Sequence, residues 1–589
     1  MASTIAVFMA LQLDSAAFVD GRYIPVGNDS FYHARRILDA AIGVRGFYQF
    51  DNMIHVPEGS WVNWPWAYDY LVARALAMAV WIRPSIEPMA FLAHVPVVWI
   101  FVNMGLLTMI GRQIRLGAAP TAIVLLGFAL LPLTQTLHGV GIIDHHFIEL
   151  TFVLAAVCSG LLYFSASDRV VNAIVLGIVL GMAPAFHNGL FILQIPVLAC
   201  VLAQWLRRKA PRNRSLVWLA GTLIGSTLLV CLPSIPFRVL QFEFWTLSWF
   251  HLYIAGCSGL CLIFFGWRPV TKPNIGLLLA IGTVMVVPIF AKLLSGTAFL
   301  TGDLQVLANI TEVKSPFARI SEPGGILWVT SYYSRIIFLA PLIVGLFAVR
   351  AWHSDDSANV YFSIFVVFGV LLMLAQYRLH PFGSWALLLG SLLLIDEWRD
   401  RQGISPLAAS AATLLVFAIA YQPPLKNGLF YIHPPGFDRN YAATRTLFPS
   451  LAAECAEKSG TVLAYSDDGH YIRYHTDCSV FTNNFLLTPF HAKKILEADT
   501  LLQMTPEQLL RAAPNVKYVF VRMYEIFERG PNGMQPTPIP AVAARNAPLF
   551  AALTFAPEFP ENFRLIDEIR VKDDRDFAYA RVFQIVQND

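Results

Sequence analysis

The sequence predicts a polytopic α-helical membrane protein of about 13 spans with a C-terminal α/β domain, from its composition, its apolar windows and its basic loops. Of the 589 residues, 56% are hydrophobic and only 14% are charged, whereas soluble domains carry about 25% charged residues. The net charge of +3 is too small for a nucleic-acid-binding surface. No nucleic-acid partner is therefore expected.

The apolar windows are long enough to cross a bilayer, which takes roughly 20 residues of α-helix. Residues 3–12 form a shorter apolar run, so either the true start of the chain lies upstream of Met1 or this first span is incomplete. No basic segment precedes this run, which argues against a cleavable signal peptide. The other windows lie at residues 88–110, 118–137, 147–166, 170–187, 189–206, 215–235, 245–266, 275–297, 326–349, 358–377, 381–396 and 404–421.

The loops between these windows predict the orientation, because cytosolic loops are enriched in Arg and Lys. With the N-terminus inside, the inside loops include RQIR (112–115), RRKAPRNR (207–214) and DEWRDRQ (396–402). Hydropathy and charge therefore agree. The outside segments are then residues 13–87, 138–146, 236–244, 298–325, 378–380 and the chain from residue 422.

The composition changes after Tyr421, so we expect a transmembrane domain over 1–421 and an extracytoplasmic domain over 422–589. The second segment has the size of one ordinary domain. It contains strand-like runs (TVLAYS, VKYVFVR, ARVFQIV) and helix-like runs (PSLAAECAEK, TPFHAKKILEA). Cys455 and Cys478 both lie in it and are candidates for a disulfide in an oxidising compartment.

Ionisable residues beside apolar spans are costly and are often functional. Asp29, in GNDSFYHARR (27–36), either caps the helix that follows or belongs to a site. In DHH (144–146), Asp144 and His146 can converge on one divalent cation, unless this loop is only a polar interfacial turn. Glu149 lies about one helical turn further on, where we expect a structural partner of these groups.

Two further groups fall at predicted outer ends. Glu312, in ITEV, belongs to a long outer loop whose other charged residues can also be a solvated surface. Arg378, in QYR, lies between two apolar windows. Its side chain either extends to the membrane interface or pairs with a phosphate or carboxylate.

Taken together, these groups fit the displacement of a diphosphate from a lipid carrier. A metal ion and the arginine would neutralise charge on the leaving phosphate. A carboxylate would orient or deprotonate the incoming nucleophile. Oxygen and imidazole ligands favour Mg²⁺ or Mn²⁺.

The motifs NDSFYHARR, DHH, ITEV and QYR resemble those of the oligosaccharyltransferases, single-subunit bacterial and archaeal enzymes of the C-type glycosyltransferase (GT-C) superfamily. The resemblance covers nearly the whole chain. It implies that Asp29, Asp144 and His146 are the ligands of Mn²⁺ or Mg²⁺. It also implies catalytic roles for Asp29, Glu312 and Arg378, and contacts to donor or acceptor from His145 and Arg378.

The C-terminal segment departs from this family, which reads the hydroxyl of its protein acceptor with the motif WWDYG. The corresponding place reads YSDDG (465–469), without either tryptophan. Tyr465 and Asp468 are the candidates for acceptor binding there, although YSDDG can also be a simple turn at a strand end. Ser466 cannot replace the surface of an indole. A glycan or lipid acceptor, or a protein read in another way, is therefore favoured slightly over a protein Asn.

The leading hypothesis is a metal-dependent transferase that moves a sugar or oligosaccharide from a polyprenyl-(di)phosphate carrier. The reaction would take place at the extracytoplasmic face of the cell (inner) membrane. The alternative is a related transferase that uses a polyprenyl-monophosphate sugar to modify a glycan or lipid. A transporter or flippase is the third hypothesis, and no inverted repeat of the transporter kind is visible in the sequence.

Overall fold

The computed structural model describes residues 1–12, 14–43, 45–211, 213–296, 313–429, 439–522, 526–530, 533–537, 549, 553, 559–571 and 577–586. Contacts divide the chain into two compact units. We call residues 1–25 and 64–436 the membrane unit, and residues 26–63 and 437–589 the C-terminal unit. The segment 26–63, which the sequence analysis assigned to the first outer loop of the transmembrane domain, thus packs with the C-terminal unit.

The membrane unit is helical, and each predicted apolar window overlaps a helix. Its main helices are α1 (Ala2–Leu11), α4 (Ala67–Ile82), α5 (Pro88–Gln113), α6 (Ala118–Leu130), α7 (Pro132–His138), α8 (His146–Ser165), α9 (Val170–Met182), α10 (Gln194–Leu206), α11 (Asn213–Cys231), α13 (Trp249–Trp267), α14 (Lys272–Gly296), α18 (Gly325–Tyr333), α19 (Ala340–His353), α20 (Ser357–Ala375), α21 (His380–Gln402) and α22 (Pro406–Leu429). Among the described residues, nine helices are long and apolar enough to cross a membrane, or ten if α6 and α7 form one span. The prediction of a multi-pass helical membrane protein is confirmed.

Two apolar windows contain breaks that composition does not reveal. Helices α6 and α7 meet at an angle of 65°, because Pro132 follows Leu131, whose ψ of 127° is extended. A proline disfavours the helical conformation of the residue before it. Helix α18 ends at Ser334, whose φ of +63° is left-handed. A short 3₁₀ turn over Arg335–Leu339 then leads into α19.

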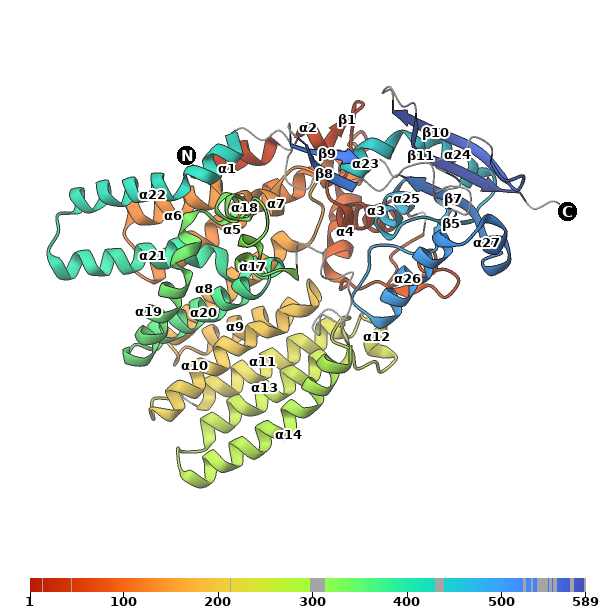
Figure 1. Ribbon diagram of the computed structural model, residues 1–589. Helices are drawn as coiled ribbons and strands as arrows, with labels where there is room; N and C mark the ends of the chain where they lie inside the picture. Colours follow the sequence, from red (N-terminus) through yellow and green to blue (C-terminus); the bar gives the residue numbers. More distant parts are fainter. Residues whose placement is uncertain are drawn as a thin grey trace. The chain divides into compact units, whose positions relative to one another are not determined.

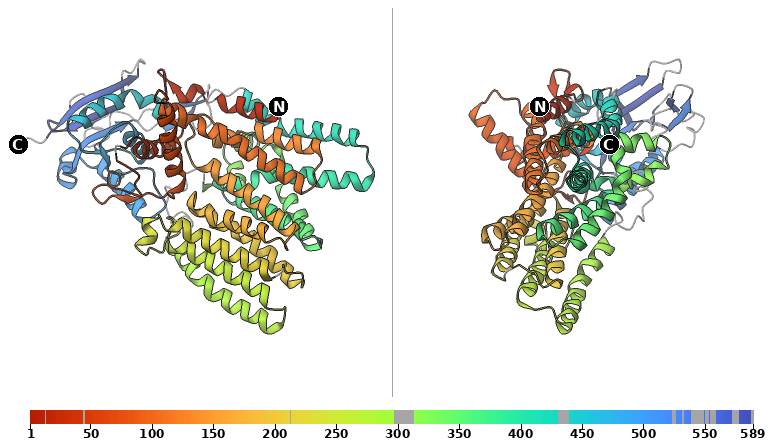
Figure 2. Two further views of the ribbon diagram at one scale, coloured as in Figure 1. Left: turned by 180° about the vertical axis from the view of Figure 1, so that it is seen from behind. Right: turned by 90° about the vertical axis from the view of Figure 1, so that its left-hand side faces the viewer.

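Small residues set the spacing between the helices. Helices α5, α8, α9, α11 and α13 contact one another in that order, and α14 contacts α13; the views from opposite sides show this row (Figures 1 and 2). A Cβ atom at Gly177 or Gly181 of α9 would lie 2.0 Å from Thr222 or Ser226 of α11. Glycine at both positions therefore allows the close approach that membrane helices use to pack.

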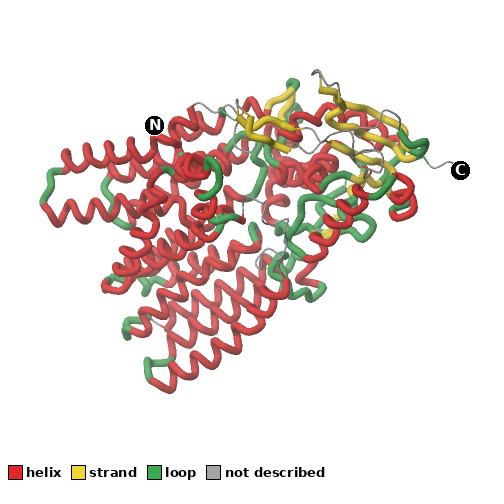
Figure 3. The backbone as a smooth tube through the Cα atoms, viewed as in Figure 1, coloured by secondary structure: helices red, strands yellow, loops and turns green. Residues whose placement is uncertain are grey.

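The C-terminal unit is built on a five-stranded mixed sheet in the order β10-β11-β7-β5-β6. Strand β5 (Thr461–Leu463) is parallel to β6 (Ser479–Val480) and β7 (Val516–Arg522). Strand β11 (Phe577–Ile585) is antiparallel to β7 and to β10 (Phe563–Val571). Figure 3 shows these strands in yellow with helices beside them. The helices are α24 (Phe448–Glu457), α25 (Gly469–His475), α26 (Pro489–Gln503) and α27 (Pro506–Ala512). The predicted α/β domain is confirmed.

The segment 26–63 contributes helix α3 (Asn28–Ile42) and a small ribbon of β3 (Phe50–Asp51) and β4 (Ser60–Trp61) to this unit. It also covers an edge of the sheet. The Val480 amide donates to the Met53 carbonyl at 2.8 Å, and the Val56 amide donates to the Val480 carbonyl at 3.4 Å. This pairing satisfies backbone groups of the edge strand β6.

A disulfide joins Cys455 of α24 to Cys478 just before β6, the pair that the sequence left open. We expect Cys455→Ala to lower the free energy of unfolding of the C-terminal unit by about 3 kcal/mol, because the bond closes a loop in the unfolded chain. The measurement is thermal unfolding of the full chain with and without reductant. Cys257→Ala, which removes a free thiol of α13, is the control. A wild-type protein insensitive to reductant would contradict the prediction.

Candidate functional site

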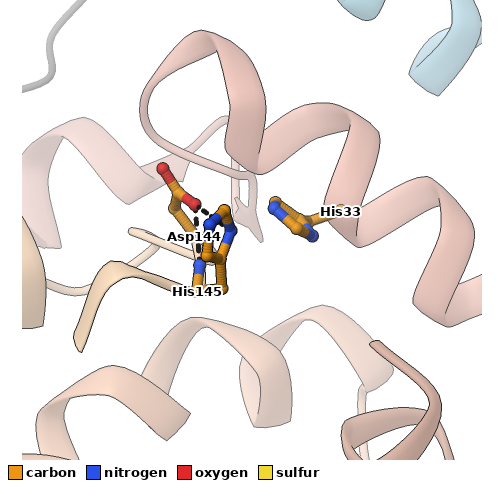
Figure 4. Close-up of side chains that lie close together, drawn as sticks. All are labelled: His33, Asp144 and His145. Carbon is orange, nitrogen blue, oxygen red and sulfur yellow. Dashed lines mark hydrogen bonds and ion pairs between the residues drawn. The ribbon is translucent and has the colours of Figure 1, made fainter. Parts of the chain in front are cut away.

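The loop between α7 and α8 places Asp144 directly before α8. Asp144 Oδ1 accepts from the backbone N–H of His145 at 2.7 Å and lies 2.8 Å from Nδ1 of the His145 ring (Figure 4). His33, also drawn there, is a buried residue of α3 in the C-terminal unit. One oxygen of the Asp144 carboxylate is therefore fixed by the next residue, which is itself 1% exposed.

The second oxygen of Asp144 faces His146. Asp144 Oδ2 lies 3.3 Å from Nε2 of His146, the first residue of α8. The other ring nitrogen, Nδ1, lies 2.8 Å from Oε2 of Glu149. Since a carboxylate only accepts, His146 Nδ1 donates to Glu149, which leaves Nε2 as the ring nitrogen that faces Asp144. Carboxylate and imidazole thus present two donor atoms to one place.

Glu149 joins His146 to a second histidine. Its side chain is 2% exposed, and its Oε1 lies 3.5 Å from Nδ1 of His187. The His187 ring stacks on His145 with 5.1 Å between centroids. The sequence analysis expected Glu149 to be a structural partner but did not single out His187. The polar pair His187 and Asn188, where one apolar window ends and the next begins, is the sequence feature that could have identified it.

Arg378 lies in a 3₁₀ turn (Tyr377–Leu379) before α21, and its charge acts electrostatically on His146 and His187. The membrane unit thus brings together an aspartate, a glutamate, several histidines and an arginine from three parts of the chain. A carboxylate oxygen of Asp144 and an imidazole nitrogen of His146 face each other, and this pair of ligand types fits a divalent cation.

Asp29, the third expected ligand, lies in the first turn of α3 in the C-terminal unit. The N-cap of α3 is Gly27, so Asp29 is not the capping residue. The Asp29 side chain is 36% exposed, and its Oδ1 lies 3.6 Å from Nδ1 of His470. Burial is the main cause that lowers the pKa of His470 to about 3. The ring beside Asp29 is therefore neutral.

Glu312 lies outside the described residues. The residues that follow it form ion pairs with one another. Lys314 Nζ lies 2.7 Å from Glu322 Oε1, and Arg319 Nη1 lies 2.8 Å from Glu322 Oε2. These three side chains satisfy one another in a partly exposed cluster, the solvated surface that the sequence left open.

The YSDDG segment forms a 3₁₀ turn (Ser466–Asp468) followed by α25. Asp468, a candidate for acceptor binding, is fully buried. Arg522 Nε donates to its two oxygens at 3.0 and 2.9 Å. The Arg522 guanidinium lies 5.6 Å from the centroid of the Tyr465 ring. The Asp468 carboxylate is therefore paired with Arg522 in the interior of the C-terminal unit.

No family model matches the chain, and no curated protein matches it in sequence. Among solved structures, it is similar to the oligosaccharyltransferase AglB of Archaeoglobus fulgidus, in complex with an inhibitory peptide and a dolichol-phosphate. The TM-score is 0.74 at 16% identity, over 96% of this chain and 78% of that one. The chain shares the fold of AglB. The resemblance drawn from the motifs is thus confirmed for the fold.

Other solved structures similar to this chain include further AglB complexes and a second transferase. AglB tethered to an acceptor peptide with the NVT sequon matches with a TM-score of 0.67 at 15% identity, over 96% of this chain and 79% of that one. The arabinofuranosyltransferase AftD from Mycobacteria matches over all of this chain but 41% of its own, with a TM-score of 0.54 at 12% identity. A further AglB structure contains Zn and sulfate. The solved structures similar to this chain thus include two different transferases, AglB and AftD.

Proposed function

We propose that this protein is a glycosyltransferase that moves a sugar or oligosaccharide from a polyprenyl-(di)phosphate carrier to an acceptor at the extracytoplasmic face of the cell membrane. The observation that supports it most is the arrangement of Asp144, His146 and Glu149 at the start of α8, with Arg378 within electrostatic range, in a chain with the AglB fold. AglB with a dolichol-phosphate makes a lipid phosphate the natural donor class.

The proposed roles follow from the chemistry of each group. Asp144 and His146 hold Mn²⁺ or Mg²⁺, and the sequence motif adds Asp29 as a third ligand. When bound, the ion neutralises negative charge on the donor phosphate. Arg378 pairs with a phosphate oxygen through its guanidinium. Glu149 fixes the tautomer of His146 by accepting from Nδ1. Asp29 also orients the incoming nucleophile. Glu312, in the predicted outer loop 298–325, is a further catalytic residue.

The acceptor is proposed to be a glycan or lipid rather than a protein Asn. Two observations favour this choice: YSDDG lacks the two tryptophans of WWDYG, and the carboxylate of Asp468 is buried against Arg522. Neither observation distinguishes a polyprenyl-diphosphate donor from a polyprenyl-monophosphate donor. The second candidate function is therefore transfer from a polyprenyl-monophosphate sugar.

The test is a transfer assay with the full chain in nanodiscs. Undecaprenyl- and dolichyl-linked sugars, as diphosphates and monophosphates, are each offered with an NVT peptide and with an envelope glycan fraction. We expect mass spectrometry to show sugar transfer to the glycan fraction from a diphosphate donor. Transfer only to the Asn of the peptide would overturn the proposed acceptor. Movement of the lipid-linked sugar across the membrane of proteoliposomes that contain the full chain, without transfer, would overturn the proposed enzyme.

A further inference from the structure

The first turn of α3, which carries Asp29, is bonded to YSDDG and to the segment that follows it. Asn28 Nδ2 donates to the carbonyl of Asp467 at 2.7 Å. Asn484 Nδ2 in turn donates to Asn28 Oδ1 at 3.4 Å. Both polar ends of the Asn28 amide are thus taken by residues at the two ends of the segment 467–484. The residue next to Asp29 has a fixed position.

The ring of His470 lies beside the Asp29 carboxylate. Its ring is fully buried and packs between Tyr32, 5.1 Å away, and Phe485, 5.2 Å away, measured between ring centroids. A ring enclosed in this way has little room to change its orientation. Its Nδ1 stays 3.6 Å from Asp29 Oδ1. One side of the Asp29 carboxylate thus faces the enclosed ring of His470, while the Asp29 side chain remains partly exposed.

The support of His470 is rigid in turn. A Cβ at Gly469 would lie 2.4 Å from the carbonyl oxygen of Thr482 and 2.7 Å from Cα of Asn483. Only glycine allows this close approach of two backbone segments. The buried pair of Asp468 and Arg522 fixes the preceding turn. Asp468 and Gly469 therefore cannot shift without an uncompensated charge or a clash.

The same segment follows α3 along its next turns. Phe31 packs edge-to-face on Tyr471 and Tyr474, with centroids 4.7 and 5.2 Å apart. Further along, Arg35 Nη2 lies 2.7 Å from Asp477 Oδ1. Helix α25 and α3 thus contact each other along their lengths. These contacts cover the face of α25 that packs against α3.

We propose that the residues Asp467–His470, together with Asn484, set the position of the Asp29 carboxylate, with His470 as the positioning residue. The inference rests on the proposed function, in which Asp29 is a metal ligand. A ligand held within a fraction of an ångström avoids reorganisation when the ion binds. The segment that corresponds to the acceptor motif in the family therefore serves the donor side of the reaction here.

The test compares three variants of the full chain in nanodiscs. His470→Phe keeps the ring and its packing but removes Nδ1, and His470→Gln restores a polar group. The matched control is His475→Phe, a buried histidine of the same helix that packs on Phe448 with 4.8 Å between centroids. The measurements are Mn²⁺ affinity, from the free-ion signal in electron paramagnetic resonance, and thermal stability. Asp29→Asn is the reference for loss of a ligand.

We expect His470→Phe to weaken Mn²⁺ binding about tenfold, as loss of an outer-shell partner does. His470→Gln should recover part of this loss, and His475→Phe should bind as the wild type does. If His470→Phe binds Mn²⁺ normally while Asp29→Asn does not, the positioning role is wrong. If His475→Phe loses affinity as much as His470→Phe, the effect is general destabilisation, and the proposal also fails. Normal binding by Asp29→Asn would overturn the proposed ligand set itself.

Discussion

Asp144→Asn is expected to reduce the rate of sugar transfer by roughly 100-fold or more, the cost of losing a charged group that stabilises developing charge. The substitution keeps the shape of the side chain but removes its negative charge. It also replaces one oxygen that faces His146 Nε2 or is held by His145 with an amide nitrogen. EDTA should abolish the wild-type rate, and added Mn²⁺ or Mg²⁺ should restore it. The measurement is the initial rate with a lipid-linked donor at several Mn²⁺ concentrations.

Two other variants separate the roles within this site. Asp168→Asn changes an exposed aspartate of the same unit and should leave the rate unchanged. Glu149→Gln retains an oxygen that accepts from His146 Nδ1, so its loss of Mn²⁺ affinity should be smaller than that of Asp144→Asn. Full activity of Asp144→Asn, or a wild-type rate insensitive to EDTA, would show that the metal site has been assigned wrongly.

The parts of the structure that depend on local sequence could be predicted. Apolar length locates the helices, because a bilayer demands internally satisfied backbone over about 20 residues. Alternating and amphipathic runs locate strands such as Val516–Arg522 and helices such as Pro489–Gln503. The DHH motif places Asp144 and His146 together because they are two residues apart at a helix start.

The parts that depend on distant contacts could not be predicted. Asn28 bonds to Asp467, 439 positions away in the chain, and no local pattern at either residue reveals this. The same is true of His187, whose approach to Glu149 depends on how α8 packs against the turn before α10. Asp468 looks like a polar loop residue in YSDDG, and only its distant partner Arg522 explains its burial.

Asp468→Ala is expected to destabilise the C-terminal unit by about 3–5 kcal/mol, because it leaves the buried guanidinium of Arg522 without its counter-charge. Both side chains are 1% exposed, so water cannot replace the lost partner. The matched control is Asp477→Ala, which breaks the ion pair with Arg35. The Asp477 side chain is 75% exposed, and such pairs contribute about 1 kcal/mol or less. The measurement is thermal unfolding of the full chain.

The double variant Asp468→Leu with Arg522→Met removes both charges together and should recover much of the lost stability. This comparison distinguishes the two roles considered for Asp468. If the carboxylate only holds Arg522, the double variant regains stability and also regains transfer, since the turn that supports His470 is restored. If the carboxylate binds the acceptor, the double variant folds but keeps a raised KM for the acceptor. Equal stabilities of Asp468→Ala and Asp477→Ala would exclude the structural role, and the burial of Asp468 against Arg522 makes that the less expected result.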